Sequence, residues 1–198
     1  MKKLGIVFFD FDGTLIKADS FSLFAKFAVG KRLFYSALFR TMPYIIRWKL
    51  GLLSNSKAKE YLFFNLYKGR SRAWFEEKGQ EFMRLIDNHL RTDTIALLEE
   101  YKGKRFEICI VTASLSQWVE PWAAAHSINY VLSTEAAFDK EDNLTGKFAT
   151  PNCHGEEKVR RISERFPQLR TEYSQIHAFG DSRGDLPMIR FAGSGRLV

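Results

Sequence analysis

The sequence predicts an α/β fold with a doubly wound parallel sheet and a helical cap inserted after the first strand. An apolar run at residues 3–9 ends in polar turn residues, which is typical of a buried strand. From about residue 20 to 100, apolar and aromatic residues recur at three- and four-residue spacing, which indicates helices. Strand-like and helical patterns then alternate, which favours a parallel sheet with helices on both faces.

The helical block after the first strand divides into about four helices. Gly30, Pro43 and Gly51 interrupt its apolar periodicity, as do the polar stretches at 54–56 and 68–71. Because glycine and proline are poor residues for a helix interior, we expect breaks or turns at these positions.

The second half of the chain alternates between the two kinds of element. Ser114 is expected to cap the helix that follows the second strand, since a serine hydroxyl accepts hydrogen bonds from a first helical turn. The expected elements are a strand at 105–113, a helix at 114–126, short strands within 129–149, a helix at 155–166, a strand at 175–181, a helix at 183–193 and a last strand at 195–198.

This pattern predicts two parts within one chain of 198 residues. Residues 1–19 and 91–198 are expected to form the sheet-containing core, and residues 20–90 the cap. The length suits one domain with an insertion. Hydrophobic content of 45% and aromatic content of 15% are sufficient for a packed core.

Cysteine usage favours a reducing, cytoplasmic location. The chain has two cysteines, Cys109 and Cys153, and the first lies in an apolar run typical of a core strand. Two such residues do not form a disulfide framework. A membrane-spanning helix needs about 18 consecutive apolar residues, and the best candidate, residues 33–53, is interrupted by charges and a proline.

Positive charge is concentrated in the cap. Residues 20–90 contain 13 Lys and Arg but five Asp and Glu, whereas the rest of the chain is nearly neutral. This asymmetry indicates either an anionic partner or a solvated helical face. No nucleic-acid-binding motif accompanies the charge, so nucleic acid is not expected.

Polar residues follow several of the predicted strands. Asp10 and Asp12 follow the first strand, Thr112 follows the second, and Asp181 follows a later one. In an open parallel sheet, ligands bind beyond the carboxyl ends of the strands. Three clustered carboxylates need a cation, and Mg²⁺ is the natural one for oxygen ligands. Together with Lys158, they predict a site for a phosphate group.

The order of these residues resembles the haloacid dehalogenase (HAD) superfamily of phosphatases. Taken singly, each residue also fits an ordinary turn, strand end or solvated charge. However, the four motifs of the superfamily have matches in order along the whole chain: "DFDGTL" (10–15), "IVTAS" (110–114), Lys158 and "GDSRGD" (180–185). A receiver domain uses similar residues but lacks a large helical insertion. The resemblance implies a HAD-like, Rossmann-type core and phosphoryl transfer rather than dehalogenation.

The resemblance also implies roles for the acids. Asp10 would be the nucleophile that forms an aspartyl-phosphate. Asp12 would act as general acid and then general base, and its backbone carbonyl would bind Mg²⁺. Asp181 would be a further Mg²⁺ ligand, and Asp185 a supporting acid at the metal. Asp10 itself completes the predicted metal ligands.

Other positions match the substrate-binding parts of the superfamily. Thr112 would hold the phosphoryl oxygens and Lys158 would neutralise their charge. Gly13 would provide a turn that lets the backbone approach the phosphate. The remaining candidates for substrate binding are neighbours within the same motifs or next to them, namely Thr14, Asp19, Ala113, Ser114 and Arg183.

Within the superfamily, an insertion after the first motif resembles subclass IB, which includes phosphoserine phosphatases and phosphatidylglycerophosphatase C-like enzymes. Phosphoserine phosphatases hold the substrate amine with a Glu nine positions after the nucleophile. Asp19 occupies that position here, and it either serves as a shorter amine ligand or caps the helix that starts near Ser20. Arg183 in the fourth motif departs from the pattern of phosphoserine phosphatases.

These observations leave the substrate open between two kinds of monoester. The leading expectation is a lipid phosphate such as phosphatidylglycerophosphate, because aromatic and basic residues are interleaved at 20–53, as in segments that contact anionic membranes. The same aromatic residues could instead form the core of the cap. The alternatives are a small soluble monoester such as phosphoserine, and a membrane-associated binding module without turnover.

Overall fold

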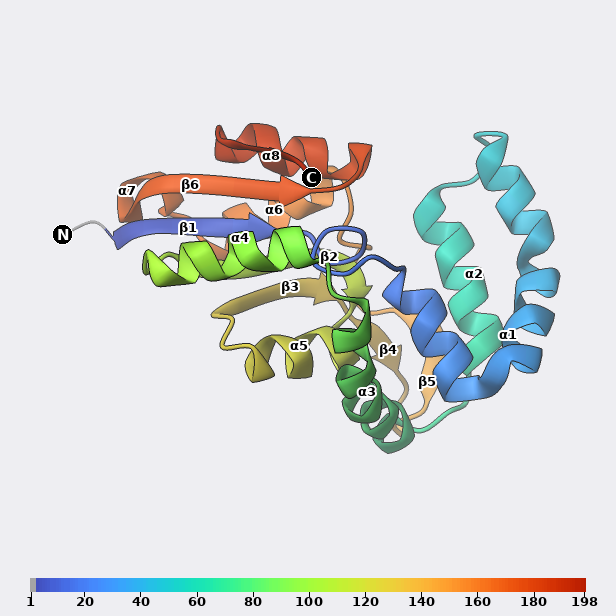
Figure 1. The fold of residues 1–198 in the computed structure, drawn as a ribbon. Helices are drawn as coiled ribbons and strands as arrows, with labels where there is room; N and C mark the ends of the chain where they lie inside the picture. The colour runs from blue at the N-terminus through green and yellow to red at the C-terminus, as the bar shows by residue number, and fades with distance from the viewer. Residues whose placement is uncertain (1–2) are drawn as a thin grey trace.

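The computed structural model describes residues 3–198 and confirms the predicted α/β fold. The central sheet has five strands in the order β3-β2-β1-β6-β7, and every pairing within it is parallel (Figure 1). Its strands are β1 (Lys3–Phe9), β2 (Glu107–Leu115), β3 (Tyr130–Thr134), β6 (Tyr173–Gly180) and β7 (Gly195–Leu197).

Helices cover both faces of this sheet because the first strand is apolar on both sides. Val7 and Phe9 pack with the cluster that includes α4 (Thr92–Gly103) and α5 (Ser116–Ala125). Ile6 and Phe8 point the opposite way, toward α6 (Glu156–Arg165) and α8 (Leu186–Ala192). Alternate residues of a strand face opposite sides, so a continuous apolar run requires a helical layer on each side.

Three short elements complete the core. β4 (Ala136–Phe138) and β5 (Leu144–Phe148) form a separate antiparallel pair. The helix α7 (Leu169–Glu172) precedes β6, and the 3₁₀ helix η2 (Arg183–Asp185) precedes α8. β4 and β5 lie where the sequence predicts short strands, and η2 lies at the start of the helix predicted at 183–193, whereas α7 was not predicted.

Two local predictions in the second motif are wrong. β2 continues to Leu115, so Thr112 lies inside the strand rather than after it. Ser114 does not cap α5, because Leu115 is the residue at that helix start and no side-chain cap forms there. The pairing of β2 with β3 shifts register between Val111 and Leu115, and this irregularity extends the strand past the predicted end.

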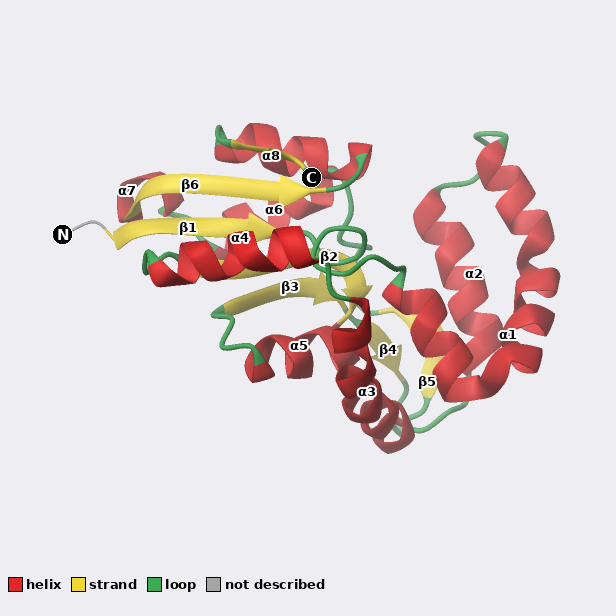
Figure 2. Cartoon of the chain, viewed as in Figure 1, coloured by secondary structure: helices red, strands yellow, loops and turns green. Residues whose placement is uncertain are grey.

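The inserted segment forms α1 (Ser20–Lys49), α2 (Asn55–Tyr67), α3 (Arg72–Ile86) and the 3₁₀ helix η1 (Asp87–His89) (Figure 2). Gly30 interrupts α1 with φ 81° and ψ 156°, so the helix is two segments joined at a sharp bend. A positive φ is costly for other residues and favours glycine. With α2 and α3, the two segments give the four helices that the sequence predicts. The expected break at Pro43 is wrong, because Pro43 lies inside the second segment of α1.

The part of the insertion nearest the sheet shares the hydrophobic core. Phe24 of α1 stacks on Trp118 of α5, with 4.5 Å between ring centroids. Phe75 and Phe82 of α3 meet the same Phe24 ring edge-on. These rings belong to one buried cluster with residues of β1 and β2. The base of the insertion is therefore fused to the sheet by aromatic packing.

The far part of the insertion extends away from the sheet (Figure 1). We call residues 31–67, which comprise the second segment of α1 and α2, the cap hairpin. Large apolar side chains of the hairpin face solvent, including Phe39 at 77% exposure and Leu52 at 68%. The others are Leu33, Tyr35, Met42, Ile46, Trp48, Leu50, Tyr61 and Phe64. Across residues 3–198, no helix is long and apolar enough to cross a membrane.

Candidate active site

The polar residues predicted to form a site do meet at one edge of the sheet. Asp10 follows β1, Thr112 lies in β2, and Asp181 follows β6. These three strands are neighbours in the order β2-β1-β6, and parallel strands bring their carboxyl ends together. Lys158 of α6 and Asp185 of η2 reach the same edge from the face of the sheet that α6 and α8 cover.

A buried ion triad forms the centre of this site. The Lys158 ammonium donates to Asp10 Oδ1 at 2.6 Å and to Asp185 Oδ1 at 2.5 Å. Lys158 is 1% exposed, Asp185 2% and Asp10 7%. Charges buried this deeply are costly unless paired, so the triad holds its members in one arrangement.

The triad shifts the pKa values of its members. Burial raises the pKa of the Asp10 carboxyl to about 7, although the Lys158 charge opposes this shift. Burial also opposes ionisation of Asp185, but the Lys158 charge and hydrogen bonds outweigh it and hold the pKa of Asp185 below its usual range. Burial disfavours the Lys158 ammonium, yet the two carboxylates raise its pKa above the ordinary value. Lys158 is thus a permanent cation at neutral pH.

Asp12 lies beside the triad in a hydrogen-bond network of its own. Ser114 Oγ donates to Asp12 Oδ2 at 2.6 Å, and the Ser20 backbone N–H donates to Oδ1 at 3.1 Å. The Ser20 hydroxyl contacts Ser114 Oγ at 2.8 Å and accepts from Trp118 Nε1 at 2.9 Å. Burial raises the pKa of Asp12 to about 6, whereas these hydrogen bonds lower it. A carboxyl in this range can give and accept a proton near neutral pH.

The loop after β1 is tied to the start of α4. Arg91 donates from Nη1 to the Gly13 carbonyl at 2.7 Å, and Thr94 Oγ1 donates to the Thr14 carbonyl. Gly13 has φ 77°, and a Cβ there would lie 2.2 Å from Asp181 Oδ2. Thr14 Oγ1 also reaches Asp10 Oδ2 at 3.5 Å. At position 13, both the positive φ and the lack of space for a Cβ therefore require glycine.

The acids at the sheet edge form a donor set that suits a hard divalent cation. Ligand oxygens of Asp10, Asp181 and Asp185 lie within 4.8 Å of one another. The Asp12 side chain turns instead toward Ser114. Both Asp185 oxygens already accept hydrogen bonds, from Lys158 and from Ser182. Oxygen-only donors fit Mg²⁺, and the missing Cβ of Gly13 leaves room beside Asp181.

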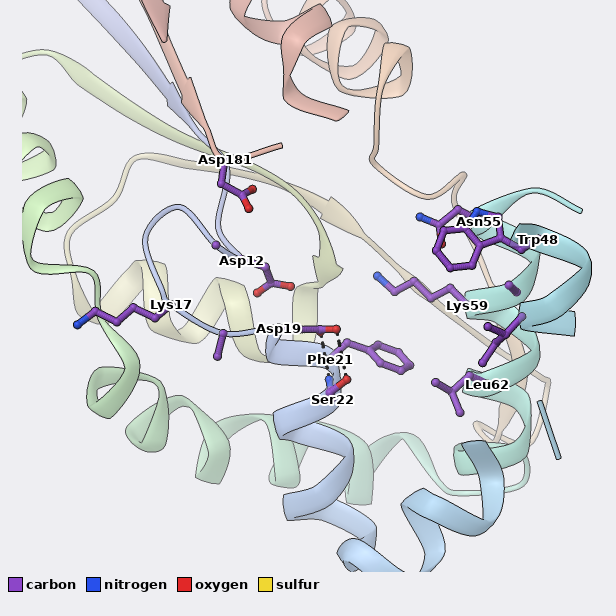
Figure 3. A pocket seen from close by; sticks show the side chains of 14 residues that line it. Asp12, Lys17, Asp19, Phe21, Ser22, Trp48, Asn55, Lys59, Leu62 and Asp181 are labelled. Atoms are coloured by element: carbon purple, nitrogen blue, oxygen red, sulfur yellow. Dashed lines mark hydrogen bonds between the residues drawn. The ribbon is translucent and has the colours of Figure 1, made fainter. Parts of the chain in front are cut away.

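A cavity of about 630 Å³ lies at Asp12 and Asp181, whereas Asp10 and Asp185 are not among its lining residues. Figure 3 shows Asp12, Asp19 and Asp181 on its core side, with Trp48, Lys59 and Leu62 on the cap side. Its other lining residues are Gly13, Lys17, Ala18, Phe21, Ser22, Ile45, Asn55 and Ala58. One wall is therefore acidic and the other largely apolar.

The remaining predicted substrate-binding residues have diverse positions. Asp19 lines the cavity, but its carboxylate accepts hydrogen bonds from the backbone and hydroxyl of Ser22, so its expected role as a helix cap is confirmed. Thr112 is buried, and its hydroxyl accepts from the Ser114 N–H at 3.0 Å. The Ala113 carbonyl faces the cap. Arg183 is exposed in η2 and is not a lining residue of this cavity.

Sequence reasoning missed several residues that shape the site. Lys59 projects from α2 toward Asp12 and Asp19 (Figure 3). Arg91 and Thr94 hold the loop after β1, although they lie 78 or more positions away in the chain. Lys59 lies between Lys57 and Glu60 in an ordinary helical pattern, so no spacing distinguishes it from a solvated lysine. Only the packing of α2 against the core reveals it.

Comparison with known proteins assigns the family. A family model described as haloacid dehalogenase-like hydrolase matches residues 7–190. The chain therefore belongs to the haloacid dehalogenase-like hydrolases. The protein CicA of Caulobacter vibrioides is 30% identical over 192 residues, which cover 94% of this chain and 82% of CicA.

Solved structures show the same fold. A Bordetella pertussis protein of unknown function superposes with a TM-score of 0.81 at 22% identity, over 98% of this chain and 89% of that one. A phosphoserine phosphatase with a phospho-aspartyl intermediate analogue gives a TM-score of 0.64 at 18% identity, over 98% of this chain and 86% of that one. The predictions of this superfamily and of a phosphoserine-phosphatase-like fold are confirmed. The family match and a phosphoserine phosphatase of Lactococcus lactis, 26% identical over 107 residues that cover 54% of this chain and 49% of that protein, support a phosphatase.

Proposed function

We propose that this hydrolase is a Mg²⁺-dependent phosphatase that cleaves a phosphate monoester through an aspartyl-phosphate. Residues 1–19 and 91–198 form the catalytic core in this proposal, and residues 20–90 form the cap. The observation that carries it is the buried Lys158–Asp10 pair at 2.6 Å, with a second acid, Asp12, beside it. The location that fits is the cytoplasm, as the two buried free cysteines suggest.

In the first step, an Asp10 oxygen attacks phosphorus while the bond to the substrate oxygen breaks. Asp12 gives its proton to the departing oxygen, which leaves as an alcohol. Asp12, with a pKa raised to about 6 by burial, retains a useful protonated fraction for this step. Lys158 neutralises charge on the attacking carboxylate and the transferred phosphoryl group, and Thr112 holds a phosphoryl oxygen.

In the second step, water attacks the phosphorus of the aspartyl-phosphate. Asp12, now ionised, accepts the proton of that water, and the bond between Asp10 and phosphorus breaks to release phosphate. Ser114 and the Ser20 N–H orient the Asp12 carboxylate in both steps through their hydrogen bonds. The second step therefore restores to Asp12 the proton that the first step uses.

Asp10, Asp181 and the Asp12 backbone carbonyl would hold the Mg²⁺, with Asp185 as a supporting acid. When bound, the ion would neutralise the clustered carboxylates and polarise the phosphoryl group. The protein's own contribution is the fixed spacing of the acids. Burial is the largest of the factors that raise the pKa of Asp181, which is consistent with an acid that awaits a cation.

A lipid phosphate fits the cavity best. The apolar wall formed by Ile45, Trp48 and Leu62 continues onto the exposed apolar side chains of the cap hairpin. Basic residues Lys31, Arg32, Arg40, Arg47 and Lys49 lie on the same helical segment. We propose that this surface contacts an anionic membrane, which would bring a lipid monoester such as phosphatidylglycerophosphate to the site. Arg183, outside the cavity, stays a predicted substrate contact.

A small soluble monoester such as phosphoserine is the second candidate. Asp19 lines the cavity at the position that phosphoserine phosphatases use for the substrate amine. Because its carboxylate already accepts two hydrogen bonds from Ser22, Asp19 has less capacity for an amine than an unpaired acid would have.

The test is phosphate release from phosphatidylglycerophosphate in mixed micelles and from phosphoserine in solution, each with and without Mg²⁺. We expect Mg²⁺-dependent release that is faster from the micellar substrate. Asp10→Asn should abolish release, and a covalent ³²P label on the protein, trapped by acid, should vanish with it. Turnover that persists in Asp10→Asn would refute the mechanism, and absence of release from any monoester would leave a binding module as the better description.

A further inference from the structure

Lys59 is a cation at the cavity that the proposed chemistry does not use. It belongs to α2 of the cap, yet its side chain reaches the core, where Nζ donates to the Ala113 carbonyl at 2.7 Å. The Phe21 ring lies 5.2 Å from the same nitrogen. In Figure 3, the Lys59 side chain points between the acidic wall at Asp12 and the apolar wall at Trp48.

Lys59 differs from Lys158 in how its charge is balanced. Lys158 contacts two carboxylates and is thereby neutralised. Among residues 3–198, no carboxylate forms an ion pair with Lys59. An ammonium group has three donors, and the Ala113 carbonyl occupies one of them. Burial lowers the pKa of Lys59, while the nearby charges of Asp12, Asp19 and Asp10 oppose this shift.

The place of Lys59 in the cavity defines what it can reach. The scissile phosphate must lie against Asp10 and Lys158, so the departing alcohol lies farther out, toward Asp12. Lys59 faces Asp12 from the cap, and Trp48 and Leu62 lie on the cap side with it (Figure 3). Ile45 lines the same cavity. Lys59 therefore faces the portion of the substrate between the scissile phosphate and any apolar tail.

We propose that Lys59 determines specificity by binding a second anionic group on the departing alcohol, a phosphodiester or a carboxylate. A partly buried ammonium without an ion pair forms strong charge-assisted hydrogen bonds with such a group. A monoester without a second charge would leave this ammonium without an ion pair in the substrate complex, which costs binding energy. The inference rests on the proposed phosphatase function and specifies its substrate class.

A purely structural interpretation predicts something different. If the bond between Lys59 and Ala113 serves only to hold α2 against the core, its loss would impair all substrates to the same degree. The selectivity between substrates separates these interpretations, because the structural role does not depend on the alcohol. Lys57 gives a matched control: it lies two residues earlier on the same helix, is exposed and pairs with Glu60.

The experiment compares kcat/KM of the wild type, Lys59→Met, Lys59→Arg and Lys57→Met on two pairs of substrates. The lipid pair is phosphatidylglycerophosphate, which has a phosphodiester, and phosphatidic acid, which has none, in identical micelles. The soluble pair is phosphoserine, which has a carboxylate, and ethanolamine phosphate, which has none. Each pair therefore isolates the second anion.

We expect Lys59→Met to lower the preference for the substrate with the second anion at least tenfold, mainly through KM. This should be seen in the pair that the wild type hydrolyses more efficiently. Lys59→Arg should retain most of the preference, and Lys57→Met should equal the wild type. The pair in which this preference falls shows whether the second anion is a phosphodiester or a carboxylate. An equal loss on both members of each pair would overturn the inference while leaving the phosphatase intact. Inactivity of the wild type on all four substrates would instead refute the proposed function.

Discussion

The triad at the sheet edge buries charged side chains, whereas the cap hairpin exposes large apolar ones. The triad buries three charged side chains, Asp10, Lys158 and Asp185, to 7% exposure or less. The hairpin leaves Phe39 at 77% exposure and Tyr35 at 55%. Ordinary folding would exchange these environments, since charges prefer water and large rings prefer the core. Both exceptions are costly in isolation, and both therefore indicate places where stability gives way to function.

The two regions differ in what would compensate for that cost. The cost of the triad is compensated within the protein. Lys158 pairs with both acids, and the Ser182 hydroxyl donates a hydrogen bond to the second oxygen of Asp185. Within residues 3–198, the exposed rings of the hairpin have ring contacts only with neighbours in the cap, as Tyr35 has with Phe34 and Tyr61 with Tyr44, and these contacts leave much of their surface exposed. The proposed compensation for this exposure is a membrane surface. The difference predicts that triad variants act on stability and chemistry together, whereas variants of the exposed hairpin rings act on association alone.

Removal of the central cation should have the largest effect. Lys158→Met leaves Asp10 and Asp185 without their shared partner in a buried position. The loss of one member of a buried ion cluster costs about 3–5 kcal/mol. We expect this decrease in the free energy of unfolding in urea, together with loss of phosphate release. Unchanged stability would mean that water reaches the triad and that the contrast with the hairpin is smaller than proposed.

Mg²⁺ should relieve the remaining repulsion among the acids. Because the ion would bind the folded site and not the unfolded chain, a concentration 100-fold above its Kd should stabilise the protein by about 2.7 kcal/mol. Thermal unfolding with and without Mg²⁺ measures this effect. Asp181→Asn should reduce it, and an equal shift in that variant would contradict the assignment of Asp181 as a ligand.

The hydrogen bond from Ser114 to Asp12 should set the pH dependence of the first step. Burial raises the pKa of Asp12 to about 6, and the Ser114 hydroxyl lowers it by stabilising the ionised form. Ser114→Ala should therefore raise that pKa further. Because the first step needs protonated Asp12, the alkaline limb of the kcat/KM profile should move to higher pH by several tenths of a unit or more.

An alkyl phosphate is the right substrate for this profile, since its alcohol needs a proton to leave. p-Nitrophenyl phosphate is the control, because nitrophenolate leaves without one and the limb should respond less. A limb that moves to lower pH in Ser114→Ala would show that the hydroxyl does not stabilise the Asp12 carboxylate.

A hairpin variant should have the smallest effect on folding. Phe39→Ser should change the free energy of unfolding by less than about 0.5 kcal/mol, as expected for a surface residue. The matched Phe24→Ala variant in the base should cost about 3–5 kcal/mol. Sedimentation with vesicles containing phosphatidylglycerol should show weaker binding of Phe39→Ser. Equal vesicle binding by wild type and variant would remove this ring from the proposed membrane contact.

The sequence was sufficient for the layout of the fold because periodicity reports it directly. The apolar run before Asp10 predicted a strand with helices on both faces, and Gly30 predicted the break in the first cap helix; both predictions are confirmed. The positions of the four motifs followed from that layout. The end of β2 could not be predicted, because it lies at a register shift against β3, and no local sequence pattern specifies the pairing of two strands.

Contacts between segments that are distant in the sequence could not be predicted either. The exposure of Phe39 and the burial of Phe24 are invisible in the sequence, since both are aromatic residues at helical spacing. Ser114 was expected at a helix start and instead donates to Asp12. Lys59, Arg91 and Thr94 reach the site only through tertiary packing. Local chemistry predicts which residues react, but not which ones position them.

The stack of Phe24 on Trp118 has a consequence for how this enzyme could diversify. A base that shares rings with the sheet is inherited with the sheet, because its deletion would open the hydrophobic core. The exposed rings of the hairpin, such as Phe39, carry no such obligation, because they lie outside that buried cluster. Substitutions among these exposed rings could therefore change what the cap contacts, while the buried core and the residues at the sheet edge stay the same.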